Sequence, residues 1–210
     1  MGEVRVVLIG GTSNTGKSTI AAAVADELGF EHRSTDYLAR HPGRPWRTPE
    51  REVPPHVADH YATLTTDELI RSVLDHYERL WPRIAEIVTD HAAGPGRGLV
   101  LEGSALWPAR VAELAVPHTA AVWFTADPAV LRARVHALGH YAEATPEERH
   151  LMDRFLARTE RYQTLMLDAV DRLGLARIDT GTGRSVPELA GTVLTTVHAQ
   201  DAVGRSPAAP

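Results

Sequence analysis

Short runs of apolar residues alternate along this chain with longer stretches in which apolar residues recur every three or four positions. The short runs predict buried β-strands, because a strand covered on both faces is apolar throughout. They lie at residues 4–9, 98–103 and 120–124, and two further strands are expected at residues 30–34 and 177–179. The longer stretches have the period of an amphipathic helix. They lie at residues 18–28, 66–88, 147–173 and 186–197, and a further helix is expected to begin at Asp127-Pro128.

Strands that alternate with helices throughout a chain are typical of a three-layer α/β fold with a parallel sheet. With 210 residues the chain is expected to form one domain, which we place at residues 1–198. Residues 199–210 lack periodicity and predict a flexible tail. The pattern leaves open a kink at Pro82 and one break within the helix at residues 147–173.

A long connection follows the second predicted strand. Residues 37–63 hold five prolines and Trp46, with one helical turn expected near residues 56–61. Long ordered connections in compact domains are commonly lids or binding loops. We therefore interpret residues 37–65 as an acceptor-binding insertion, and residues from about 127 to 163 as a lid.

One glycine-rich segment joins the first strand to the first helix. Residues 11–18 match the phosphate-binding pattern G-x-x-x-x-G-K-[ST], and Lys17 is the only lysine in the chain. A lysine ammonium is a compact charge on a flexible stem, which reaches the β- and γ-phosphates better than the wide fork of arginine. The predicted nucleotide-binding residues are Gly11, Thr12, Ser13, Asn14, Thr15, Gly16, Lys17, Ser18 and Thr19. The hydroxyl of Ser18 is expected on Mg²⁺.

Two carboxylates are predicted beside this loop, because ligands of open α/β sheets bind at the carboxyl ends of the strands. Asp36 follows the second strand and Glu102 ends the third. Phosphoryl transfer needs a metal, a group that orients the attacking hydroxyl, and cations on the developing charge. We assign Asp36 as general base or acceptor anchor and Glu102 as metal or acceptor ligand, and the two roles are exchangeable.

The arginines form a second pattern. Arg154, Arg158 and Arg161 share one stripe of the long helix, and Arg132 and Arg134 lie on the helix before it. We predict that such residues close over the triphosphate, with Arg158 catalytic and Arg154 in contact with the nucleotide. The alternative is a solvated face, with the arginines paired to Glu147, Glu148 or Glu160.

The acceptor is expected to bind within residues 37–63. Polar residues of this segment that would hold an anionic or polyhydroxylated acceptor, together with an aromatic wall, are Arg40, His41, Arg44, Arg47, Trp46, His56 and His60. His56 and His60 also have the i, i+4 spacing of zinc ligands, but no third ligand is evident, so a pocket or packing role is preferred. Gly181, in the turn after the last strand, is expected to lie against the adenine.

The amino-acid composition limits which kinds of partner the protein is expected to bind. The net charge of −5 gives no sign of a nucleic-acid-binding surface, and the absence of cysteine excludes disulfides and thiolate nucleophiles. No apolar run approaches the roughly 20 residues that cross a bilayer. We therefore expect a cytoplasmic protein that acts on a small molecule, not on nucleic acid or a membrane, as a monomer or homodimer.

The chain resembles P-loop small-molecule kinases of the nucleoside, shikimate and gluconate kinase group, and among them proteins called 2-phosphoglycerate kinase-like. The resemblance rests on residues 11–19, 34–36, 101–108 and 154–162. It implies a five-stranded parallel sheet of order 2-3-1-4-5 and Mg-ATP-dependent transfer to a small acceptor. It also implies that Asp36 contacts the acceptor hydroxyl. Residues 37–63 match no substrate loop of the group, so the resemblance does not name the acceptor.

The resulting hypothesis is an enzyme that transfers the γ-phosphate of ATP, with Mg²⁺, to a hydroxyl of a sugar acid, polyol, nucleoside or natural product. One alternative is an NTP-binding switch or ATPase that acts on a protein partner. Another is a toxin-like kinase of a cell-wall precursor. Acceptor dependence separates a kinase from a switch, because a small hydroxyl compound accelerates ADP release only in the kinase.

Overall fold

The computed structural model describes residues 4–38, 42–48 and 51–204, and it contains one five-stranded parallel sheet of order β2-β3-β1-β4-β5. The fold class and strand order expected from the sequence are therefore confirmed. The strands are β1 (Val6–Gly11), β2 (Glu31–Ser34), β3 (Leu99–Glu102), β4 (Thr119–Thr125) and β5 (Arg177–Asp179).

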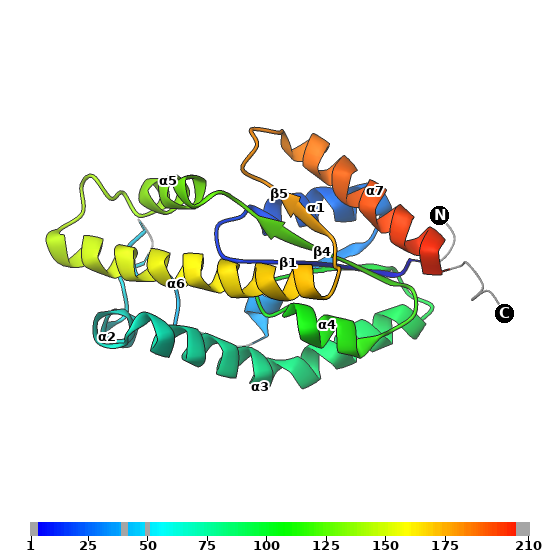
Figure 1. Ribbon diagram of the computed structural model, residues 1–210, viewed down its shortest axis with the longest axis horizontal. Coiled ribbons are helices and arrows are strands. Elements are labelled where there is room, and N and C mark those ends of the chain that lie inside the picture. Colours follow the sequence, from blue (N-terminus) through cyan, green and yellow to red (C-terminus); the bar gives the residue numbers. More distant parts are fainter. Residues whose placement is uncertain (1–3, 39–41, 49–50, 205–210) are drawn as a thin grey trace.

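Helices cover both faces of the sheet (Figure 1). Their bounds are α1 (Lys17–Leu28), α2 (Pro55–Thr63), α3 (Thr66–Ala93), α4 (Pro108–Leu114), α5 (Pro128–Leu138), α6 (Pro146–Arg172) and α7 (Val186–Gly204), with a short 3₁₀ helix η1 (Thr35–Tyr37) after β2. Helices α1 and α7 pack on one face, and α3, α4 and α6 pack on the other. Helices α2 and α5 lie at the end of the molecule to which the β4 and β5 arrows point.

The central strand shows why the strands read as continuous apolar runs. Val7 and Ile9 of β1 point toward α1 and α7, whereas Val6 and Leu8 point toward α3 and α4. All four are at most 1% exposed. Successive side chains of a strand alternate between its faces, and both faces of this sheet are covered, so no position on β1 is left for a polar residue.

A separate apolar cluster lies beyond the sheet, under the predicted acceptor and lid segments. Trp46, Val57, Tyr61, Met152 and Phe155 belong to it, and they come from the long connection, α2 and the first half of α6. The Trp46 and Phe155 rings meet edge to face with centroids 5.0 Å apart. The acceptor segment is therefore held by a core of its own.

Helix ends follow local capping chemistry. Thr65 and Thr145 each form a capping box, in which the hydroxyl accepts from the third helical N–H and the glutamate there, Glu68 or Glu148, accepts from the cap. The N-cap Asp127 accepts from Ala129 N, so α5 begins where the sequence predicts. Both long helices are continuous: α3 runs through Pro82, and α6 has no break.

Two features differ from the prediction. Helix α4 was not expected, because its seven residues are too few to show a helical period. Residues 199–204, which were expected to belong to the tail, instead continue α7 to Gly204. Gln200 explains part of this extension: its side-chain amide donates to Ala121 O (2.9 Å) and accepts from Ala121 N (3.0 Å), which pairs a stretch of β4 that β5 does not reach.

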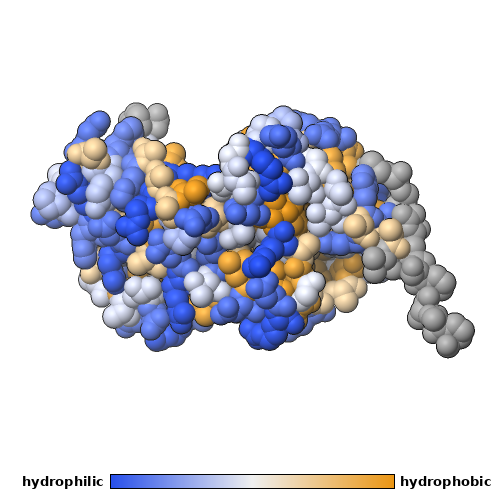
Figure 2. Space-filling model, turned by 45° about the horizontal axis from the view of Figure 1, so that its top comes forward, coloured by the Kyte–Doolittle hydropathy of each residue, from blue (hydrophilic) through white to orange (hydrophobic). Residues whose placement is uncertain are grey.

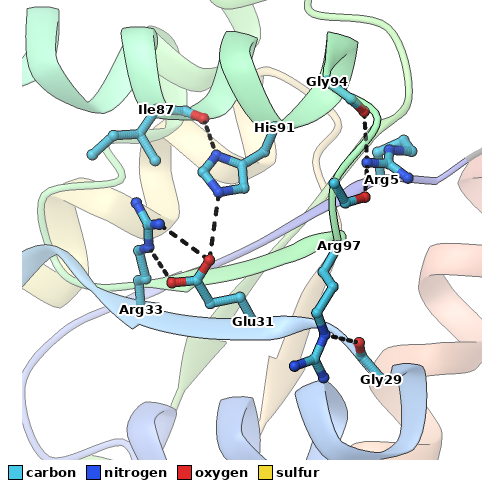
Figure 3. Close-up of polar contacts among 9 residues, drawn as sticks. Arg5, Gly29, Glu31, Arg33, Ile87, His91, Gly94 and Arg97 are labelled. Carbon is cyan, nitrogen blue, oxygen red and sulfur yellow. Dashed lines mark hydrogen bonds and ion pairs between the residues drawn. The ribbon is translucent and has the colours of Figure 1, made fainter.

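Side-chain contacts tie together the end of the sheet at which the strands begin (Figure 3). Glu31, at the start of β2, receives two hydrogen bonds from Arg33 and lies 3.6 Å from His91 Nε2 near the end of α3. Arg5 donates to Gly94 O and Gly96 O in the connection between α3 and β3. In the part of the chain that the structure describes, no helix is long and apolar enough to span a membrane.

Candidate active site

The glycine-rich segment forms a loop between β1 and α1. Gly16 is the N-cap of α1 and has φ 86°, and Asn14 has φ 63°. At Gly11 a Cβ atom would lie 2.6 Å from Phe124 O of the neighbouring strand, so only glycine allows this close approach. Backbone N–H groups at the start of a helix attract anions, and the loop places them where a phosphate chain would lie.

Lys17 lies within this loop and is only 8% exposed. Its Nζ donates to Thr12 O (2.7 Å), and the Thr12 hydroxyl in turn donates to Thr159 O on α6 (3.1 Å). Burial lowers the pKa of Lys17, while the charges of Glu102 and Asp36 act in the opposite direction. The ammonium is thus buried beside two carboxylates, where a phosphate could replace the carbonyl as its partner.

Glu102 and Ser18 meet at the foot of the loop. The Ser18 hydroxyl donates to Glu102 Oε1 (2.9 Å), and Glu102 is 3% exposed. Parallel pairing sets Glu102 opposite Ile9 of β1 and Ser34 of β2, and so fixes the carboxylate between the loop and η1. A hydroxyl and a carboxylate are the hard oxygen donors that Mg²⁺ prefers, so this pair fits the metal expected from the sequence.

Asp36 lies on η1, directly after β2. The Ser34 hydroxyl accepts from Asp36 N (3.3 Å) and caps this turn. The neighbouring Thr35 is buried against Gly103, which positions the turn relative to the end of β3. Asp36 itself is exposed and lines the same cleft as Lys17 and Glu102.

One cleft of about 980 Å³ contains all these groups. The loop lines one part of it, and residues 42–57, α3 and α6 line the rest. The polar and charged residues that line the cleft are Ser13, Asn14, Lys17, Ser18, Thr19, Thr35, Asp36, Arg44, Arg51, His56, His76, Tyr77, Glu102, Ser104, Arg134 and Arg158. Figure 2 shows that hydrophilic residues dominate the surface at the end of the molecule that carries α2 and the connection between α5 and α6.

Of the two arginines on α5, Arg134 reaches the phosphate loop. Its guanidinium donates to Asn14 O and Thr180 O, both at 3.0 Å, and the Thr180 hydroxyl donates to Thr15 O. Arg132 instead forms an ion pair with Glu160 (3.6 Å), as the solvated-face alternative predicts. Gly181, expected against the adenine, is not among the residues that line the cleft, although Thr180 beside it contacts the loop.

The three arginines of the predicted stripe on α6 do not all face the cleft. Arg154 donates to Tyr61 O and Leu64 O, at the end of α2, so its side chain supports that helix and not a nucleotide. Arg158 lines the cleft and lies over the Phe155 ring, 4.7 Å from its centroid. Arg161 is exposed and is not a lining residue. The expectation for Arg154 is therefore corrected.

The predicted acceptor residues are also divided. Arg44 and His56 line the cleft, whereas Arg40 and His41 lie outside the described residues. Trp46 was expected as a pocket wall, but it is 2% exposed, belongs to the apolar cluster and does not line the cleft.

Two further residues of this segment lie elsewhere. Arg47 is paired with Glu148 (3.5 Å). His60 packs against Tyr61, with ring centroids 5.2 Å apart, and burial lowers its pKa. Among the described residues no group of three or more histidine or acidic side chains could hold a metal ion, which removes the basis for a zinc site at His56 and His60.

Sequence reasoning missed several lining residues on α3 and after β3. Tyr77 was counted as an apolar position of α3, yet it faces the cleft, and burial raises its pKa to about 12. His76 and Ser104 line the cleft as well. The only signal for Ser104 was its place two residues after the strand-end acid, and His76 had none, because its helical position does not reveal what lies opposite.

Comparison with solved structures identifies the fold. A gluconokinase from Sinorhizobium meliloti 1021 superposes with a TM-score of 0.52 at 18% identity, covering 96% of this chain and 97% of that one. A shikimate kinase from Aquifex aeolicus vf5 gives a TM-score of 0.51 at 12% identity, covering 93% of this chain and 98% of that one. No protein-family model matches the sequence, and no curated protein matches it significantly.

These matches cover nearly the whole chain. The chain therefore has the fold of the P-loop small-molecule kinases. At such low identity the comparisons show the fold alone, so the reaction and its acceptor must be argued from the residues of the cleft.

Proposed function

We propose that this protein is an ATP-dependent phosphotransferase that moves the γ-phosphate of Mg-ATP to a hydroxyl of a small molecule. The observation that carries the proposal is the meeting of three groups in one cleft. They are the buried Lys17, the hydrogen-bonded pair of Ser18 and Glu102, and the carboxylate of Asp36. Each comes from the carboxyl end of a different strand or the loop that follows it.

The groups divide the work of phosphoryl transfer. Lys17 and the backbone N–H groups of the loop would hold the β- and γ-phosphates. Ser18 and Glu102 would hold Mg²⁺, which supplies charge neutralisation on the phosphate oxygens when bound. Arg134, which bridges the loop and Thr180, would keep the loop closed around the phosphates.

Asp36 is suited to the acceptor. It is exposed to the cleft and lies close enough to Lys17 to influence its pKa. In the proposed step its carboxylate accepts the proton of the acceptor hydroxyl while the oxygen bonds to the γ-phosphorus. The bond from that phosphorus to the β–γ bridging oxygen breaks, and ADP leaves. The cleft beyond Asp36, lined by Arg44, His56 and α3, supplies room for a small acceptor.

The test is ADP release with Mg-ATP in the presence of pooled hydroxylated metabolites. One pool is expected to stimulate the wild-type protein. Lys17→Ala should lower the stimulated rate at least about 100-fold, because it removes a preorganised cation from the transferring phosphate. Asp36→Asn should lower it about 10²–10⁴-fold while ATP binding is retained. Asp90→Asn, an exposed carboxylate on α3, is the matched control and should change nothing.

Two results would contradict the proposal. Full stimulated activity in Lys17→Ala would remove the role of the loop. ADP release that no small hydroxyl compound accelerates, but that a protein partner does, would favour an NTP-dependent switch.

A further inference from the structure

Arg158 is a buried cation on α6 that lines the cleft. It is 7% exposed, and its Nε is buried without a hydrogen bond. No hydrogen bond or ion pair of its guanidinium is found anywhere in residues 4–38, 42–48 and 51–204. The other arginine of α6 that turns inward, Arg154, differs in this respect, because its guanidinium donates to two carbonyls.

Aromatic rings hold the guanidinium in place without neutralising it. Its central carbon lies 4.7 Å from the Phe155 ring centroid and 5.8 Å from that of Tyr61. Such contacts stabilise a cation through its flat faces and leave the N–H groups at its edge free. Buried charges are normally paired, because an unpaired one loses its hydration without compensation. A preformed fork with unused donors is therefore suited to an anion that enters from the cleft.

The ring contacts place the Arg158 side chain beside the predicted acceptor segment. Tyr61 and Phe155 belong to the apolar cluster that also contains Trp46 of that segment. Among the described residues Arg134 donates to the phosphate loop, whereas no hydrogen bond from Arg158 to the loop is found. Arg158 thus belongs to the part of the cleft that adjoins Phe155 and Tyr61.

The charges along the cleft are unequal. The described lining residues include five cations, Lys17, Arg44, Arg51, Arg134 and Arg158, but only two carboxylates, Asp36 and Glu102. Magnesium offsets part of the charge of ATP, so the nucleotide alone does not balance the excess of cations. Lys17 is part of the phosphate loop and Arg134 donates to it, whereas Arg44, Arg51 and Arg158 come from the connection after η1 and from α6.

We propose that Arg158 binds an anionic group of the acceptor, so that the acceptor is a small molecule with a hydroxyl near Asp36 and a carboxylate or phosphate in the part of the cleft beside Phe155. This assignment rests on the proposed phosphotransfer activity. It differs from the sequence-based expectation that Arg158 closes over the triphosphate, and it makes Arg158 a determinant of acceptor specificity.

The experiment compares matched acceptors in the ADP-release assay. Pools of hydroxycarboxylic acids are paired with their primary amides, and pools of polyol phosphates with the free polyols. An anionic pool should stimulate, and its neutral counterpart should not. In Arg158→Gln, kcat/KM for the anionic acceptor should fall about 10–100-fold, mainly through KM, as expected for loss of hydrogen bonds to a charged group. Arg158→Lys should recover part of the loss, and Arg161→Gln, exposed one turn further along α6, should behave as wild type.

The outcomes separate this inference from the proposed function. Equal stimulation by anionic and neutral members of a pair, unchanged in Arg158→Gln, would overturn the inference and leave the phosphotransferase standing. No stimulation by any pool would overturn both. The relative response to the two anionic pools distinguishes a carboxylate from a phosphate.

A second measurement is independent of the acceptor. Arg158→Met keeps the length of the side chain and removes its charge, so the ligand-free variant should unfold at or above the wild-type temperature if the cation is unpaired. A fall in Tm of about 5 °C or more would mean that Arg158 serves the fold, and would overturn the inference.

Discussion

Gly103→Ala should disturb the contact between Gly103 and Thr35, which positions the turn η1 and its Asp36. Gly103 follows β3 with φ 154°, in a region of backbone space that is essentially restricted to glycine. A Cβ atom there would lie 1.8 Å from the Thr35 hydroxyl oxygen, 2.8 Å from Thr35 Cβ and 3.1 Å from its methyl carbon. Thr35 is 1% exposed, so it has no room to withdraw. The turn that bears Asp36 must therefore shift away from Glu102.

The cost has two parts. Overpacking of a filled site costs about 1–3 kcal/mol, and the backbone strain about 1–3 kcal/mol more. Together these amount to roughly 2–6 kcal/mol, a large share of the 5–15 kcal/mol that is typical of a domain. For a chain of this length the expected fall in Tm is roughly 5–20 °C.

Urea unfolding measures the stability, and acceptor-stimulated ADP release measures the site. Stability and turnover should both fall in Gly103→Ala. In the double variant with Thr35→Ala, part of the stability should return, because the approaches to the threonine oxygen and methyl carbon are removed while the Cβ contact and the strained backbone remain. A Gly103→Ala protein as stable and active as wild type would refute the reasoning.

Three further perturbations test other parts of the structure. Burial lowers the pKa of Lys17 below 10.5, so the unfolded chain binds more protons between the lowered pKa and 10.5, and stability rises with pH through that window. Lys17→Met should therefore have a larger free energy of unfolding in urea than wild type at pH 7, and the difference should shrink toward pH 10.5. A difference that stays constant with pH would contradict this. The hydrogen bond from Arg33 lowers the pKa of Glu31, so its contribution, under about 1 kcal/mol for so exposed a pair, is present above pH 4.5 and lost as pH falls below it. Glu31→Gln should thus be slightly destabilised at pH 7 and equal to wild type in acid, and a deficit that persists at low pH would be inconsistent with this assignment. Gln200→Ala should lower the free energy of unfolding in urea by about 1–3 kcal/mol, because it leaves the N–H and C=O groups of Ala121 without the side-chain amide, and it should not change ADP release. A loss below about 0.5 kcal/mol would show that water replaces the amide.

The elements that the sequence predicts well are those with local signals. Strands β3 and β4 were located to within one residue at each end by their apolar runs, and the start of α5 at Asp127 was located by a cap followed by proline. Helix α4 and the last turns of α7 were not, since a seven-residue helix shows no period and the α7 extension depends on Gln200 pairing with a distant strand. That pairing involves residues 79 positions apart.

The residues of the candidate site show the same difference between local signals and long-range contacts. Lys17, Ser18 and Glu102 were predicted together, because a motif fixes the first two and parallel pairing brings the acid at the end of β3 beside them. Arg154 is a residue whose contacts the sequence does not predict. Helical spacing correctly placed it on the same stripe as Arg158, but only the packing of α2 against α6 determines that it supports a helix end while Arg158 faces the cleft.

This contrast explains why the reaction can be argued from the sequence and the acceptor cannot. The proposed phosphate-binding part of the cleft consists of one continuous loop and two strand ends, so short sequence segments contain its functional residues. The proposed acceptor part consists of single residues, such as Arg44, Tyr77 and Arg158, and these come from a connection and two helices that meet only in the folded chain. Trp46 and Phe155 fix that meeting by packing against each other beneath the cleft. A change of acceptor in evolution or by design would therefore require substitutions at these scattered lining positions, with the apolar cluster left intact to hold them.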